Sequence, residues 1–144
     1  MSARSKVAVV ARILLGLAFT VSGLNFFVHF LPQPPPPPDG AAFMGALIAG
    51  KIFSIINPIE IAAGLALLGN RFVPLALTLL APIEIGILTF HAVFDPAGLP
   101  VIAVLIALTI FLARSYRAAF APMLHARVDP TAAESTSAGR TATA

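Results

Sequence analysis

Residues 72–94 read FVPLALTLLAPIEIGILTFHAVF, and this stretch decides the fold class. It contains one acidic residue and no lysine or arginine, and it exceeds the roughly 20 residues that an α-helix needs to cross a bilayer. With three similar runs, it predicts membrane-spanning helices over residues 7–31, 52–69, 72–94 and 99–120. The sequence therefore predicts an all-α membrane protein, in which residues 1–124 form one domain, a four-transmembrane-helix bundle.

The composition of the whole chain agrees with lipid as its solvent. Of 144 residues, 58% are hydrophobic and 10% are charged, whereas soluble domains average about 45–50% and about 25%. The chain contains no cysteine, which excludes disulfides, thiolate metal sites, iron–sulfur clusters and cysteine nucleophiles. The net charge of +3 comes from residues at the ends of the apolar runs, so nucleic acid is not an expected partner.

The basic residues predict how the bundle is oriented. Lysine and arginine in short loops favour the cytoplasmic side of a membrane. Three groups lie at one end of the four predicted spans, namely Arg4, Lys6 and Arg12, then Asn70 with Arg71, then Arg114, Arg117 and Arg127. Both termini are therefore expected in the cytoplasm, and the proline-rich loop over residues 32–50 is expected in the periplasm. Lys51 is the one basic residue on that outer side.

Three segments outside the predicted spans have distinctive compositions. The five consecutive prolines at residues 34–38 favour a stiff polyproline II segment and argue against helix there. Residues 40–50 are rich in alanine and glycine and fit either a short interfacial helix or the start of the second span. Residues 125–144 have few large apolar side chains, so we expect a disordered cytoplasmic tail.

Two acidic residues lie inside the predicted spans. Glu60 and Glu84 belong to a repeated PIEI sequence, at residues 58–61 and 82–85. Each lies about 8–10 residues from the outer end of its span, so both are expected in one layer. An ionisable residue within a membrane helix indicates a functional site by default. Two interpretations remain open, a hydrogen bond that only holds helices together and a pair that shares a proton as a relay.

Further polar residues are expected at matching depths. Ser22, Asn25 and His29 form a stripe at helical spacing in the first span, and His91 follows Glu84 by about two helical turns. If these faces converge, they enclose a pocket that opens outward, with Lys51 at its rim. The candidate ligand-binding or proton-relay residues are Asn25, His29, Asn57, Glu60, Glu84 and His91.

Other residues are expected to have structural roles. Glycines in membrane helices most often allow close packing, and this role is predicted for Gly16, Gly23, Gly64 and Gly86. The fourth span has no ionisable residue before Arg114 and is expected to pack or face lipid, outside the site. No metal site is assigned, and haem is not favoured because no ligand motif accompanies the histidines.

Several motifs together resemble the DoxX family of small four-helix bacterial membrane proteins. They are RILLGL at 12–17, SGLN at 22–25, HFLP at 29–32, EIAAGL at 60–65, RFVPLA at 71–76, FH at 90–91 and DPAGLP at 95–100. The resemblance covers roughly residues 8–124. Members commonly have a lysine directly after the glycine-leucine-asparagine of the first helix, where this chain has Phe26. No role for a buried lysine is therefore expected at this position.

The resemblance implies a subunit or accessory protein of a redox system in the bacterial cytoplasmic membrane. Many members are named as oxidoreductases, and a relative is a subunit of thiosulfate:quinone oxidoreductase. A quinone or small polar molecule would then occupy the pocket, with no covalently bound cofactor, and a redox partner subunit or a second copy would join it in the lipid. No self-contained catalytic motif is present. The residues alone leave open a small-solute or proton transporter and a non-catalytic scaffold that recruits a partner.

Overall fold

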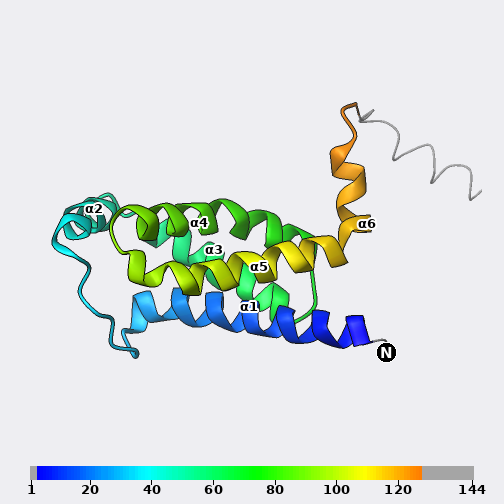
Figure 1. Cartoon of the computed structure of the whole chain (residues 1–144), viewed down its shortest axis with the longest axis horizontal. Coiled ribbons are helices and arrows are strands. Elements are labelled where there is room, and N and C mark those ends of the chain that lie inside the picture. The colour runs from blue at the N-terminus through cyan, green and yellow to red at the C-terminus, as the bar shows by residue number, and fades with distance from the viewer. Residues whose placement is uncertain (1–2, 128–144) are drawn as a thin grey trace, which may run out of the picture.

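The computed structural model describes residues 3–127, and all the regular structure in that range is helical (Figure 1). Four long helices form the body of the protein, α1 (Ala3–Val28), α3 (Phe53–Leu68), α4 (Val73–Val93) and α5 (Leu99–Ser115). The shorter elements are α2 (Pro38–Ala49), η1 (Pro96–Gly98), α6 (Arg117–Phe120) and η2 (Ala121–Leu124). Of the tail predicted over residues 125–144, residues 128–144 lie outside the described range.

The four long helices pack in a cycle. Helix α1 contacts α3 and α5, and α4 contacts the same two helices from the other side. Large apolar side chains fill the core between them, among them Leu15, Phe19, Leu67, Leu80 and Leu112. The outer surface also exposes many large apolar side chains from all four helices, which is the opposite of the polar surface that a soluble bundle requires.

Three helices are long and apolar enough to cross a membrane, and they are α1, α4 and α5 together with η1. Helix α3 has 16 residues, or roughly 24 Å, which is shorter than a hydrocarbon core of about 30 Å. It qualifies as a fourth span only when it is joined to α2, from which it is bent by 86°. The chain thus has the character of a multi-pass membrane protein with three or four spans.

Small residues set the distance between α1 and α3. A Cβ atom added to Gly64 would lie 2.8 Å from the carbonyl oxygen of Gly16, and one added to Gly23 would lie 2.9 Å from that of Asn57. Both distances are shorter than atoms tolerate, so only glycine fits, as predicted for Gly16, Gly23 and Gly64. The same prediction for Gly86 is wrong, because nothing lies within 4 Å of a Cβ added there.

Arg12 stabilises the end of α3 and does not lie before the first helix. It is buried within α1, and its guanidinium group donates to the carbonyl oxygens of Leu67 and Leu68. Those carbonyls belong to the last turn of α3, where no further helical N–H is available and where a positive charge is favourable. Arg12 therefore has a packing role that counting charges near the predicted spans did not reveal.

The helix ends differ from the predicted ends where side chains bind the backbone. Helix α1 ends at Val28 and not at residue 31, because Asn25 binds the backbone of Leu31 and His29 adopts a left-handed conformation with φ 54°. The predicted fourth span over residues 99–120 is also too long, because α5 ends at Ser115 and the chain turns at Tyr116. The hydroxyl of Tyr116 donates to the Asn70 side chain over 3.3 Å and fixes this turn.

The segment between α1 and α3 lies across one end of the bundle (Figure 1). The prolines at residues 34–37 have no regular structure, and Pro38 is the first residue of α2, a position where proline is well tolerated because its missing N–H would be unpaired anyway. The expectation of no helix at residues 34–38 is therefore wrong at its last residue. Residues 40–49 are helical and are set apart from α3 by residues 50–52 and a bend of 86°.

Candidate functional site

Glu84 is held by a threonine of the neighbouring helix. The residue is 3% exposed, and Thr109 on α5 donates a hydrogen bond of 2.7 Å from its hydroxyl to Glu84 Oε1. Thr109 is itself buried. The expectation that the fourth span stays outside the site is therefore wrong, because α5 supplies the one side chain that hydrogen-bonds this carboxyl group within residues 3–127.

Glu60 is buried to a similar degree but has a different environment. It is 5% exposed, and no hydrogen bond or ion pair from residues 3–127 reaches its carboxyl group. Its oxygens keep some contact with the surface of the bundle, because they are not among the fully buried unpaired side-chain atoms of the described residues. Glu60 therefore presents an unused hydrogen-bonding group inside the bundle.

The two glutamates lie at similar depths. Glu60 is about seven residues, or roughly 10 Å, from the start of α3, and Glu84 is about nine residues, or roughly 14 Å, from the end of α4. These two helix ends lie on the side of the bundle where α2 is found (Figure 1). Thr109 is about ten residues, or roughly 15 Å, into α5 from the same side. The helices thus carry their buried carboxyl groups in one layer.

Thr20 on α1 adds a second unpartnered group at comparable depth. Its side chain is 8% exposed, and its Oγ1 is the one fully buried side-chain oxygen or nitrogen without a hydrogen bond among the described residues. It lies against Gly64, one helical turn beyond Glu60 on α3. We refer to Thr20, Glu60, Glu84 and Thr109 as the buried polar layer.

Sequence reasoning missed both threonines of this layer. Threonine within a helix usually bonds to a carbonyl oxygen four residues earlier, as Thr78 and Thr89 do here with Pro74 and Ile85. Nothing in the sequence distinguishes Thr109 from these two. For Thr20 a signal exists, because it follows Gly16 by four residues and therefore lies on the glycine face that packs against α3.

The two asparagines have structural roles. Asn57 is buried, and its Nδ2 donates to the carbonyl oxygen of Phe53 in its own helix over 2.8 Å. Asn25 makes two hydrogen bonds with Leu31, accepting from the backbone N–H at 2.7 Å and donating to the carbonyl at 3.2 Å. The two bonds of Asn25 close the end of α1, whereas the bond of Asn57 uses its Nδ2 group and leaves Oδ1 without a partner in residues 3–127.

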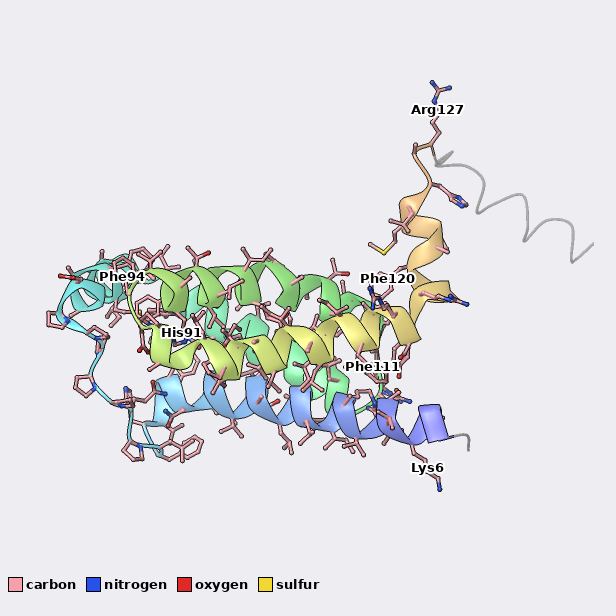
Figure 2. The ribbon with its side chains drawn as sticks, in the orientation of Figure 1. Lys6, His91, Phe94, Phe111, Phe120 and Arg127 are labelled. Atoms are coloured by element: carbon pink, nitrogen blue, oxygen red, sulfur yellow. The ribbon has the colours of Figure 1, made fainter. Side chains whose placement is uncertain are left out.

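The histidines do not join the buried polar layer. His29 is exposed in the loop after α1, and Lys51 is likewise exposed in the turn between α2 and α3. His91 lies near the end of α4 (Figure 2), where its Nδ1 is 3.3 Å from a carboxylate oxygen of Asp95. A Cβ atom at Gly98 would overlap the His91 ring. His91 and Asp95 thus form a half-exposed pair at the end of the bundle.

Aromatic side chains surround that pair on the side of α2. Phe43 of α2 stacks on Phe90 and Phe94 of α4, with ring centroids 6.1 Å and 5.5 Å apart, and Phe90 meets the His91 ring edge to face. Gly40 lets α2 approach closely, because a Cβ there would lie 3.1 Å from Phe94. Helix α2 is therefore packed onto the end of α4 next to the His91 pair.

No metal site is formed by these groups. Within the part of the chain that the structure describes, no three histidine, aspartate or glutamate side chains gather closely enough to hold a metal ion. The chemistry available to the buried polar layer is hydrogen bonding and proton exchange by two carboxyl groups and two hydroxyl groups. No family model, curated protein or solved structure matches this chain.

Proposed function

We propose that the protein spans the bacterial cytoplasmic membrane four times, through α1, α3, α4 and α5, with both termini in the cytoplasm. Cyclic packing of the four helices supports this arrangement. The start of α1 and helix α6 lie at one end of the bundle, with α2 at the other (Figure 1). Lys6, Arg71 and Arg114 belong to the first of these ends, as the preference of basic residues for the cytoplasm predicts. Helix α2 would then lie at the periplasmic surface, where it extends the short α3.

We further propose that the buried polar layer binds the polar head of a quinone or a similar small molecule. Glu60 carries this proposal, because it is a buried carboxyl group without a partner in residues 3–127. A protonated carboxyl group donates a hydrogen bond to a carbonyl oxygen, and a carboxylate accepts one from a hydroxyl group. Thr20 Oγ1, also unpartnered, can donate or accept. These are the groups that a quinone or a quinol needs at its two oxygens.

The resemblance to the DoxX family gives this site its context. The proposed role is that of a subunit or accessory protein in a membrane redox system. Because the chain has no cysteine, its own side chains would contribute binding and proton exchange. A redox centre in a partner subunit would exchange the electrons. Glu60 and Glu84 would accept or supply the two protons that accompany a two-electron step between quinol and quinone.

The test is binding of a water-soluble quinone analogue to the purified protein, measured by calorimetry for the wild type and for Glu60→Leu, Glu84→Leu and Thr109→Val. Leucine removes the hydrogen-bond donor, which glutamine would keep. A hydrogen bond between neutral groups is worth about 0.5–1.5 kcal/mol, so Glu60→Leu should weaken binding by about 2- to 10-fold. Thr89→Val is the matched control, since Thr89 is exposed and bonds only its own helix. Wild-type affinity in both glutamate variants would refute the site.

Transport of protons or a small solute is the second candidate, and the prolines favour it. Pro58 and Pro82 lie within α3 and α4, each two residues before a buried glutamate. Proline removes a backbone hydrogen bond and weakens the helix at that level, so both helices have a point of bending beside the layer. The test is solute or proton flux into proteoliposomes. Transport replaces the first function if Glu60→Gln abolishes this flux and the wild type binds no quinone.

A further inference from the structure

The end of α5 leads into a segment that leaves the bundle. Beyond Tyr116, α6 and η2 continue helically from Arg117 to Leu124 at a steep angle to α5 (Figure 1). Phe120 lies near the base of this segment, and Arg127 lies at its far end (Figure 2). Tyr116 at the turn contacts the bundle, because its ring packs against the core and its hydroxyl donates to the Asn70 side chain.

The segment exposes apolar side chains where the bundle no longer covers them. Phe120 at its base still packs partly against the bundle core, whereas Met123 and Leu124 lie further along, in the 3-10 turn η2. Met123 is 64% exposed and Leu124 is 82% exposed. A helical segment that lies across the bundle axis, with exposed apolar side chains and basic neighbours, is typical of an element that rests in the plane of a membrane interface.

Its charge is uniformly positive. Arg114, Arg117 and Arg127 are all exposed. The sequence from Pro96 to Arg127 contains no aspartate or glutamate, so no acidic side chain within this stretch offsets the arginines. Exposed arginines attract the anionic lipids of a cytoplasmic leaflet, and they do so over about one Debye length. Guanidinium groups also bind phosphate oxygens in a bidentate manner.

We propose that residues 114–127 form a membrane-surface segment that binds anionic lipid headgroups, with Met123 and Leu124 inserted among the acyl chains. This inference rests on the proposed membrane placement of the bundle, because α6 lies in the membrane plane only if α5 crosses the membrane. Charge complementarity selects anionic lipid as the occupant. A zwitterionic surface offers the same acyl chains but gives the arginines no net attraction, so the segment should contact it less often.

The chain contains no tryptophan, so a single introduced tryptophan reports on its own surroundings. The experiment places Leu124→Trp in full-length protein, reconstituted in nanodiscs of phosphatidylcholine alone or with phosphatidylglycerol, and measures quenching by brominated lipid. The expected result is strong quenching in anionic nanodiscs and weak quenching in zwitterionic ones. In the anionic nanodiscs, adding Arg117→Gln should lower the equilibrium constant for membrane contact by about fivefold.

Leu14→Trp is the control for insertion of the bundle. Leu14 is exposed on α1 near the middle of the helix, so it should be quenched equally in both lipids. If Leu124→Trp is quenched equally in the two lipids, or is quenched in neither, the segment does not bind anionic headgroups. That result would leave the proposed membrane placement of the bundle unaffected. Absence of quenching at Leu14→Trp would instead overturn the membrane placement of the bundle, and with it this inference.

Discussion

Gly64→Ala should destabilise the bundle, because α1 and α3 meet backbone to backbone at this position. The added Cβ atom would lie 2.8 Å from both the carbonyl oxygen of Gly16 and the backbone nitrogen of Thr20, and it would overlap the Thr20 hydroxyl oxygen. Only the hydroxyl can rotate away. The two backbone atoms belong to a helix, so they can yield only if α1 moves as a unit.

The size of the effect follows from that movement. Reaching ordinary van der Waals contact requires the helices to separate locally by roughly 0.6 Å, and a gap of 0.5–1 Å costs neighbouring atoms about a quarter to a half of their dispersion energy. Overpacking of this kind usually costs about 1–3 kcal/mol. The donation from Arg12 to the end of α3 crosses the same interface, so the separation also strains that hydrogen bond. We expect a loss near the upper end of this range.

Gly86→Ala is the matched control, since it makes the same chemical change in α4 where nothing lies within 4 Å. There, alanine should be neutral or stabilising by up to about 1 kcal/mol, because glycine is the poorer helix former. The assay is unfolding of purified protein in mixed micelles with increasing dodecyl sulfate, followed by circular dichroism. Equal unfolding midpoints for Gly64→Ala and Gly86→Ala would refute the reasoning about the α1–α3 contact.

Two other substitutions test side-chain hydrogen bonds at the ends of α3 and α1. Arg12→Gln removes the guanidinium donor from the last carbonyls of α3, which should lower the unfolding free energy by about 1.5–3 kcal/mol. The exposed Lys6→Gln serves as its control and should change stability by less than about 0.5 kcal/mol, and equal effects of the two would count against the cap. Asn25→Ala removes both hydrogen bonds to Leu31, so hydrogen exchange should accelerate at the Leu31 amide. Unchanged exchange there would show that Asn25 does not hold this turn.

The existence of the helices follows from the apolar runs, but their ends do not. The runs that predict α3 and α4 differ from those helices by about one residue at each end, because the turn at Asn70 and Arg71 interrupts the apolar pattern. The other two long helices end earlier than their runs. The chain turns after Val28 beside a hydrogen bond of Asn25 with Leu31, six residues away, and after Ser115 beside one of Tyr116 with Asn70, 46 residues away. Hydropathy contains no information about such bonds.

The orientation of side chains around each helix was predictable only in part. Arg12, Gly16 and Thr20 are spaced by four residues and therefore share one face. The glycine on this face predicts close packing against another helix, and that packing buries Arg12 and Thr20 as well. Counting charges treated Arg12 as a residue outside the helix. The spacing of four residues between Arg12 and Gly16 is present in the sequence, and it places Arg12 on the face of α1 that packs against α3.

The repeated PIEI sequence is where local sequence and environment differ most. The two glutamates share the four residues PIEI, yet Glu84 receives a hydroxyl donor from α5 and Glu60 receives none from the described residues. Helix α5 places Thr109 against Glu84, whereas the buried hydroxyl of Thr20 on α1 lies against Gly64, one helical turn from Glu60. A hydrogen bond already made is lost when a ligand replaces it, whereas an unpaired group gains one. A ligand that enters this layer therefore gains more from Glu60 than from Glu84, and substitutions of the two glutamates should have unequal effects despite their shared sequence.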